Sequence, residues 1–192
     1  MTESISLEGN FLIAESELGD PNFVETVILI VSHDENGAFG LVVNRKSQLS
    51  LGTASPPYKD SPFAGIPLYL GGPVEQEYLF TLHTGLPAGF GGQHSREVIP
   101  GIIFEPDFTQ VERFILEQPQ TLPPAVRLFA GYSGWAPGQL ERELAEKTWA
   151  VLPAIADLVF SDNPKGGWRD ALHRKGGIYH VVAVTGSKPS LN

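Results

Sequence analysis

Residues 26–43 have the sequence TVILIVSHDENGAFGLVV, and this stretch decides the fold class. Its first part, Thr26 to His33, is rich in β-branched residues and apolar on both faces, which is typical of a buried strand. Residues 34–37 contain Asn-Gly, the common dipeptide of tight hairpin turns. Residues 39–43 are apolar again and predict the return strand. The stretch therefore predicts an antiparallel hairpin inside the protein.

Outward from this hairpin, the sequence predicts many short elements separated by 21 glycines and 16 prolines. Residues 131–136 are expected to be a tight connection, and an interruption at Pro100 and Gly101 is expected to be a bulge or an edge. We expect further strands at 11–14, 68–70, 78–83, 97–104, 125–130, 148–152 and 178–184. We expect helices at 49–54, 107–117, 137–147, 157–160 and 168–174, with Asp107 and Gln110 as a capping box and Pro119 as a stop signal.

This order of elements favours one fold class. Strands precede the first convincing helix, and later strands and helices are mixed, so we predict an α+β fold with a mainly antiparallel or mixed sheet and a few flanking helices. A single domain is expected over residues 1–192, with a core at about 8–176 and a loosely held tail at 185–192.

The composition narrows the class of protein. The chain has 192 residues, 42% of them hydrophobic, which suffices for one domain with a substantial core. It has no cysteine, so disulfide frameworks and thiolate metal sites are excluded. The first residues lack a signal-peptide pattern, and the strongest apolar run, 27–31, is far shorter than the ~20 residues that span a bilayer. We expect a cytoplasmic protein with no membrane partner.

The net charge of −9 disfavours nucleic acid as a partner. Nucleic-acid affinity depends largely on clustered lysine and arginine, whereas the 13 basic residues here are scattered. Scatter along the sequence leaves open whether basic residues meet in the folded chain.

Residues 131–135, Gly-Tyr-Ser-Gly-Trp, form the strongest candidate for a catalytic motif. They follow an expected strand and precede an expected helix, as a nucleophile elbow does, but Trp135 replaces the last glycine of Gly-x-Ser-x-Gly. Our main interpretation is a tight turn with core aromatic residues, and the alternative is a hydrolase that uses Ser133. The available triad partners are Asp157, Asp170, His173 and His180.

Metal and phosphate motifs are incomplete. The five histidines lack the helical zinc spacing, so we expect no metal. Two glycine clusters, 71–73 and 89–92, lack the lysine and following helix of a P-loop and predict tight turns. We expect no cofactor.

Several blocks rich in glycine, proline and aromatic residues occur in a fixed order along the chain. They are 11–14, 20–23, 26–27, His33, 37–44 (GAFGLVVN), 69–74 (YLGGPV), 131–135 (GYSGW) and 137–141. Together they resemble the YqgE/AlgH family from about residue 10 to residue 175. The resemblance implies a single-domain bacterial cytosolic protein with an α+β fold and supplies no catalytic residues. One branch of the family is named for transcriptional regulation, which implies a DNA-associated regulator as a second alternative.

These observations favour a non-enzymatic binding or regulatory protein, because no catalytic set is complete. Its partner would be a small molecule or a protein. The predicted binding residues are Asn44, Gly71, Gly72, Tyr132, Trp135 and Gln139.

Overall fold

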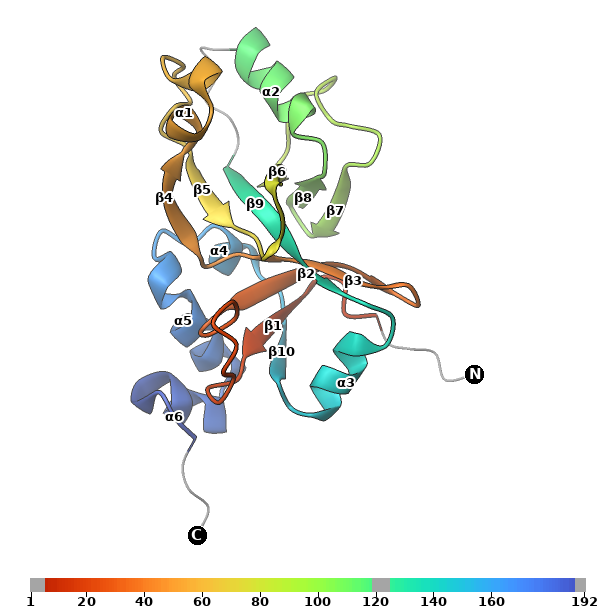
Figure 1. Cartoon of the computed structure of the whole chain (residues 1–192), viewed down its shortest axis with the longest axis vertical. Helices are drawn as coiled ribbons and strands as arrows, with labels where there is room; N and C mark the ends of the chain where they lie inside the picture. Colours follow the sequence, from red (N-terminus) through yellow and green to blue (C-terminus); the bar gives the residue numbers. More distant parts are fainter. Residues whose placement is uncertain (1–5, 119–124, 189–192) are drawn as a thin grey trace.

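The structure, a computed structural model, describes residues 6–118 and 125–188 (Figure 1). Along the chain the elements are β1 (Asn10–Ala14), β2 (Val27–Asp34), β3 (Gly37–Val42), β4 (Lys46–Ser50), α1 (Leu51–Ala54), η1 (Pro56–Tyr58), β5 (Pro67–Leu70), β6 (Val74–His83), β7 (Arg96–Ile99), β8 (Ile102–Glu105), α2 (Phe108–Glu117), β9 (Val126–Trp135), α3 (Gln139–Ala145), β10 (Trp149–Pro153), α4 (Ala156–Val159), η2 (Pro164–Gly166), α5 (Gly167–Lys175) and α6 (Ile178–Thr185).

A curled, mainly antiparallel sheet organises the molecule and confirms the predicted α+β domain. Its strand order is β10-β1-β2-β3-β9-β6-β8-β7, while β5 pairs with β9 in parallel and with β4. The long strand β9 joins the two halves of the sheet. Its first part pairs with β5 and β6, and its last part, residues 133–135, pairs with β3 (Figure 1).

The predicted hairpin is confirmed as β2 and β3, with Asp34 paired to Gly37. Gly37 has φ +127°, which residues with a side chain rarely adopt. A Cβ there would also lie 2.1 Å from the carbonyl oxygen of Trp135. The glycine therefore allows both the turn and the close approach of β9.

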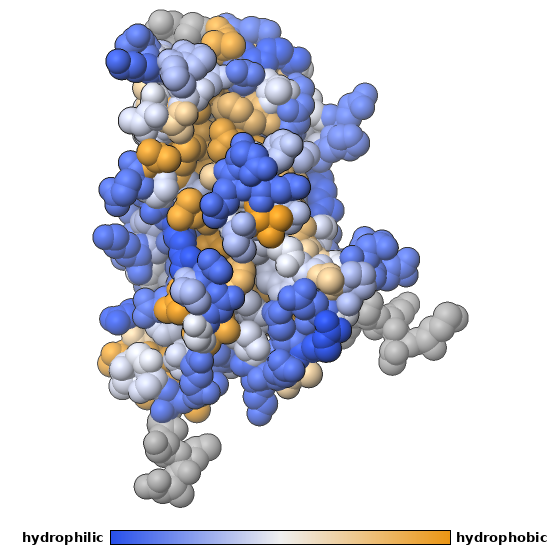
Figure 2. Space-filling model, in the orientation of Figure 1, coloured by the Kyte–Doolittle hydropathy of each residue, from blue (hydrophilic) through white to orange (hydrophobic). Residues whose placement is uncertain are grey.

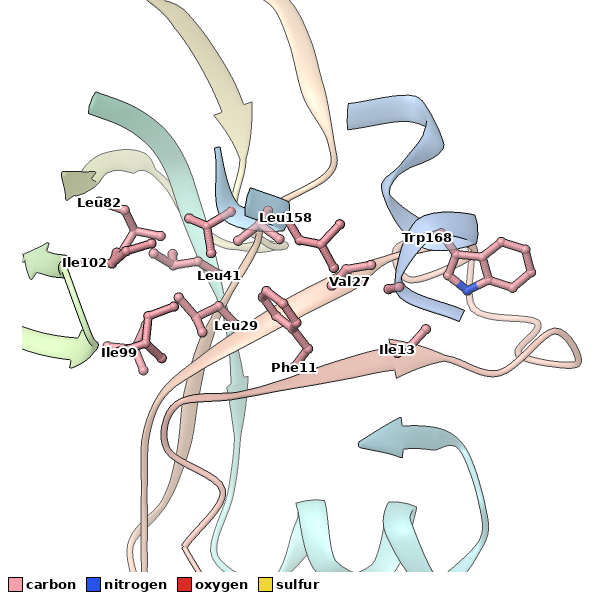
Figure 3. Close-up of a cluster of buried hydrophobic side chains, with 14 of the residues drawn as sticks. Phe11, Ile13, Val27, Leu29, Leu41, Leu82, Ile99, Ile102, Leu158 and Trp168 are labelled. Atoms are coloured by element: carbon pink, nitrogen blue, oxygen red, sulfur yellow. The ribbon is translucent and has the colours of Figure 1, made fainter. Parts of the chain in front are cut away.

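Three apolar clusters hold the layers together. The largest lies between one face of β1, β2 and β3 and helices α4, α5 and α6. Trp168 packs at its α5 end near Ile13 and Val27, whereas Phe11 and Leu29 lie nearer its middle (Figure 3). A second cluster joins the opposite face to α3, and a third lies under α1 and α2. Burying one such large apolar side chain stabilises the fold by about 1.5–3 kcal/mol.

The prediction of a tight connection at 131–136 is wrong, because β9 continues to Trp135. The segment stays extended since residues 133–135 hydrogen-bond to β3. Its glycines leave room for neighbouring atoms that a side chain would contact, and they do not form a turn. The helix that follows starts at Gln139, behind Gly138 with φ +70°.

The strand expected at 97–104 is two strands, β7 and β8, separated by a turn at the expected interruption. β7 is the last strand in the sheet order, which agrees with the edge alternative. Ile99 and Ile102 pair across a turn made by Pro100 and Gly101, and Gly101 has φ +78°. Proline followed by glycine suits the two central positions of a type II turn.

The final strand expected at 178–184 is helix α6. Its β-branched residues favour a strand locally, but Gly176 and Gly177 turn the chain back and α6 packs on α5. Val182 and Ala183 are buried in the main core, so tertiary packing overrides the local preference.

The ends of three predicted segments differ slightly from the structure or lie outside it. Leu49 belongs to β4, so the helix expected at 49–54 covers only 51–54. Asp107 caps α2 through the backbone N–H of Thr109, whereas Gln110 contacts the side chain of Asp107 and no reciprocal capping box forms. Pro119 and the end of the 185–192 tail lie outside the described residues. None of the helices in the described ranges has the length and apolarity needed to cross a bilayer.

Candidate functional site

Three of the blocks found in the sequence meet where β3, β5 and β9 cross. The N–H of Gly71 donates to the carbonyl of Ala130, and the carbonyl of Gly71 accepts from Val42, both at 2.9 Å. A Cβ on Gly72 would lie 2.1 Å from the carbonyl group of Tyr132. The glycine pair is therefore required for backbones to touch at this crossing.

Four aromatic rings cluster beside this crossing. Phe39 stacks on Tyr132, with ring centroids 4.6 Å apart and an interplanar angle of 22°. Phe80 meets Phe39 edge-on at 5.3 Å, and Phe104 lies 5.6 Å from Phe39. Phe104 is buried, whereas Phe39, Phe80 and Tyr132 are partly exposed, so the cluster reaches the surface.

A pocket of about 320 Å³, here called the aromatic pocket, opens over three of these rings. Its basic rim residue Arg96 donates to the carbonyl of Val31 and pairs with Glu8 at 3.2 Å, so its charge is already compensated. The pocket is therefore mainly an apolar surface. Its lining residues are Val31, Ser32, Phe39, Phe80, His94, Arg96, Phe104 and Pro106.

A second pocket of about 670 Å³, here called the acidic pocket, adjoins the first and shares Phe80 and Pro106 with it. Hydrogen bonds from Thr109 hold the pKa of the Asp107 carboxyl below its usual value, so it stays ionised. No basic residue lines this pocket among the residues that the structure describes. Its lining residues are Glu75, Glu77, Tyr78, Leu79, Phe80, Pro106, Asp107, Phe108 and Thr109. We call the two pockets together the groove.

A bulge in β6 shapes the acidic pocket. Val74 pairs with Tyr132 and Leu79 with Ala130, so residues 75–78 face Gly131 alone on β9. Gly131 has φ +69°, and a Cβ there would lie 2.6 Å from the carbonyl oxygen of Val74. The extra residues are pushed outward, which leaves Tyr78 58% exposed at the rim.

Apolar side chains are exposed on one face of the molecule, as at an interaction site. On the face shown in Figure 2, apolar residues form a broken band down the upper half of the molecule between polar flanks. Large exposed apolar side chains include Val74, Tyr78 and Leu116. Apolar residues that gather on one face mark interaction sites more often than single exposed residues do.

The six binding residues predicted from the sequence do not line one common pocket. Of the six, Tyr132 alone joins the aromatic cluster, whereas Gly71 and Gly72 are buried in the strand crossing. Asn44 hydrogen-bonds to the backbone of Val27 and Glu25 and lines a separate pocket. Whether these residues contact a ligand stays a prediction.

Trp135 and Gln139 lie together on the opposite face, against α3. The indole N–H of Trp135 donates to Glu143 at 2.8 Å, and so does that of Trp149 at 2.7 Å. The side-chain amide of Gln139 donates to the other oxygen of the same carboxylate. Glu143 thus binds buried aromatic residues together, which is a structural role.

Ser133 does not have the setting of a nucleophile. It is fully buried within β9, and its hydroxyl donates to the carbonyl of Gly71 at 3.2 Å. No histidine contacts it in the described part of the chain. His173 and His180, the bases considered for a triad, contact each other through their Nδ1 atoms at 2.9 Å. The elbow interpretation therefore lacks both the turn and the base.

No group of three or more histidine, aspartate or glutamate side chains in the described ranges could hold a metal ion. His33 accepts a hydrogen bond from the N–H of Leu7 at Nδ1, so its Nε2 donates to Glu141 at 3.1 Å. His83 uses Nδ1 to accept from Gly85. Both histidines therefore make hydrogen bonds within the protein that are typical of structural residues.

The sequence did not indicate Phe80, Phe104 or Glu75 as site residues. Phe80 and Phe104 look like ordinary strand residues, and their meeting with Phe39 depends on strand order. The one available signal was the aromatic residue of block 37–44 and the first of the two aromatic residues in block 131–135. Those two residues, Phe39 and Tyr132, do stack.

Comparison with known proteins shows similarity over the full chain. A family model described as AlgH-like matches residues 11–180. The chain is 37% identical over 200 residues to a UPF0301 protein of Streptomyces coelicolor, covering 100% of this chain and 98% of that protein. It is 34% identical over 184 residues to a UPF0301 protein of Chlorobium phaeobacteroides, covering 96% and 95%.

Solved structures agree with this similarity. The solution structure of the AlgH protein from Pseudomonas aeruginosa matches with a TM-score of 0.73 and 31% identity, and the match covers both chains completely. The crystal structure of a Corynebacterium diphtheriae protein matches with a TM-score of 0.74 over 95% of this chain and 94% of that one. At 23% identity, the second likeness shows the fold alone.

Proposed function

We propose that this chain, which belongs to the AlgH-like family, is a non-enzymatic binding protein whose groove receives a segment of a partner protein. The main supporting observation is that the aromatic pocket adjoins the acidic pocket, whose carboxylates have no ion-pair partner among the described residues. The partner segment would carry an apolar or aromatic side chain next to lysine or arginine.

The apolar half of the groove suits a large side chain. Phe39, Phe80 and Phe104 line a pocket of about 320 Å³, and pairs of aromatic rings gain about 0.5–1.5 kcal/mol beyond the area they bury. Tyr78 stands exposed at the rim, and tyrosine is enriched in protein interfaces. An aromatic side chain from a partner would complete a cluster that the chain leaves open.

Charge complementarity supports a basic partner. Glu75, Glu77 and Asp107 line the acidic pocket, and none of them forms an ion pair among the described residues. The rings of Tyr78 and Phe80 lie beside them, so a cation could gain from both carboxylates and ring faces. The same charges would repel a phosphate backbone, which argues against DNA in this groove.

A binding experiment tests the proposal. The probe is a short fluorescein-labelled peptide with one tryptophan between lysines, and fluorescence anisotropy is the readout. We expect binding that is lost when the lysines of the peptide become glutamates. Replacing both Glu75 and Glu77 by glutamine should weaken binding about tenfold, since each charge pair contributes up to ~1 kcal/mol.

Two controls make the result specific. The double variant Glu17→Gln/Glu146→Gln removes the same charge from a different pocket and should bind like the wild type. Tyr78→Ala should bind less tightly and still fold, because that ring is mostly exposed. If both double variants bound the peptide equally weakly, only net charge would matter, and the groove would be refuted as the binding site.

The hydrolase alternative has a separate test. The burial of Ser133 and its bond to Gly71 support a structural role for the hydroxyl. Hydrolysis of p-nitrophenyl acetate should be equally slow in the wild type and in Ser133→Ala. A clear loss of turnover in the variant would favour the hydrolase.

A further inference from the structure

A basic pocket lies away from the groove, between the start of β4 and η2. Its volume is about 380 Å³, and its charged lining residues are Arg45, Lys46 and Lys165. No carboxylate lines it among the described residues, although the chain has 22 acidic and only 13 basic residues. Residues far apart in the sequence thus produce a local positive charge.

Hydrogen bonds hold the side chain of Arg45 in one position beside this pocket. Its guanidinium donates to the backbone carbonyls of Asn22 and Val24, the latter at 3.2 Å. These acceptors are neutral, so the positive charge of Arg45 is held in place without being cancelled.

An adjoining pocket of about 270 Å³ shares Lys46 and adds a buried cation, Arg127. Arg127 is 7% exposed, lies over the ring of Tyr69 at 4.3 Å and donates to the carbonyls of Val43 and Ser161. No carboxylate pairs with it within 4 Å in the described part of the chain.

The buried charge of Arg127 therefore lacks an ion-pair partner. Burial lowers the pKa of its guanidinium because the charged form loses solvation. Asp162 lines the same pocket and offsets part of this charge from a distance. An anion in these pockets would compensate the remainder.

The beginning of α5 adds a further positive contribution. A Cβ on Gly167 would lie 2.9 Å from the Cβ of Asn44, so the first turn of this nine-residue helix lies against a lining residue of the basic pocket. Its N-cap, Gly166, offers no side-chain cap, and of the first N–H groups that of Gly167 donates to the carbonyl of Pro164 in η2. Helix N-termini carry about half a positive charge and favour phosphate groups.

We propose that these two adjoining pockets bind a small anion that carries phosphate groups. Two arginines and two lysines converge there, arginine suits the geometry of phosphate oxygens, and lysine contributes charge. The volume of about 380 Å³ falls at the lower end of the range for small-molecule sites, and the adjoining 270 Å³ lies just below that range. The site is independent of the groove and extends the role of the chain to sensing or carrying a phosphorylated compound.

Isothermal titration calorimetry with inorganic pyrophosphate tests this site. We expect saturable binding to the wild type at low ionic strength. In Lys46→Gln/Lys165→Gln the affinity should fall at least tenfold with an unchanged thermal unfolding midpoint. Lys59→Gln removes an exposed lysine outside both pockets and should bind like the wild type.

Each remaining outcome is decisive. Equal loss in Lys59→Gln, or no loss in the double variant, would overturn the proposal. Equal affinity for succinate, a dianion without phosphate, would also overturn the assignment to phosphate. Binding of a DNA duplex with the same dependence on Lys46 would assign the pockets to a nucleic-acid backbone instead. Peptide binding in the groove should be unaffected by the double variant, so the two proposals fail separately.

Discussion

Phe39 on β3 and Tyr132 on β9 stack with their ring centroids 4.6 Å apart. This contact joins the first hairpin to the strand that crosses into the other half of the sheet. It also fixes the wall of the aromatic pocket, since Phe39 lines that pocket and Phe80 meets both rings. The fold and the proposed binding surface therefore depend on the same strand crossing.

Replacing Gly72 by alanine should destabilise the protein strongly. The new Cβ would lie 2.1 Å from the carbonyl group of Tyr132, which is backbone and cannot move aside. Overpacking of this kind costs about 1–3 kcal/mol or more in the free energy of unfolding, measured by urea denaturation. A Cβ at Gly19 would have no neighbour within 4 Å, so Gly19→Ala should change the free energy of unfolding by less than about 1 kcal/mol. Similar values for the two variants would contradict the close crossing.

Glu143→Ala should lower the free energy of unfolding by roughly 2–6 kcal/mol. It removes the acceptor of two buried indole N–H groups, those of Trp135 and Trp149, and each unsatisfied donor costs about 1–3 kcal/mol. Urea denaturation followed by tryptophan fluorescence measures the change. The exposed Glu146 provides the control, and its alanine variant should stay within about 0.5 kcal/mol of the wild type. An unchanged free energy of unfolding in Glu143→Ala would refute the role of Glu143 as the shared acceptor of the two indole N–H groups.

His83 should make the protein less stable in acid. It is 2% exposed, and burial lowers its pKa from 6.5 although Glu105 opposes the shift. The unfolded chain then binds a proton first as the pH falls. This contribution to stability is complete above pH 6.5 and is lost as the pH falls through the folded pKa.

The measurement is the free energy of unfolding between about pH 7 and about pH 5. We expect His83→Gln to show a smaller decrease over this interval than the wild type. Identical slopes would mean that His83 titrates normally in the folded chain.

Tyr179 should stabilise the docking of α6 until the pH becomes strongly alkaline. Its hydroxyl donates to Glu15 at 2.9 Å, and burial together with this bond raises the pKa of Tyr179 to about 12. Because the folded pKa lies above the unfolded value of 10.0, the contribution is complete below pH 10 and is lost as the pH rises toward 12. Wild type and Tyr179→Phe should therefore differ in unfolding free energy at pH 8 and converge at high pH. A constant difference would exclude this linkage.

The first hairpin could be predicted because local signals agreed with the final packing. Residues 27–31 are apolar on both faces, and the strand they form is covered by clusters on both sides. The turn at 34–37 had its own sequence signature.

The end of β9 could not be predicted, because its glycines have the same local appearance as a turn. Their cause lies elsewhere in the sequence, in the approach of residues 71–72 to residues 131–133. Helix α6 was missed for a related reason. Its composition favours a strand, whereas its helical state depends on packing against α5.

The candidate site was even less predictable. Tyr132 was identified, but the groove also needs the bulge at 75–78 and the pairing of β6 with β9, which only strand order determines. Charge gave a partial signal. Three of the 13 basic residues, Arg45, Lys46 and Lys165, meet between the start of β4 and η2, and the acidic residues at 75 and 77 line the pocket that shares Phe80 with the aromatic pocket.

The most direct test of the groove is a chemical-shift map of the ¹⁵N-labelled protein titrated with the lysine-tryptophan peptide. The account predicts shifts concentrated at Glu77, Tyr78, Phe80 and His94, with little change at Lys46 or Gln139. Shifts centred on any other surface, or none at peptide concentrations far above that of the protein, would contradict it.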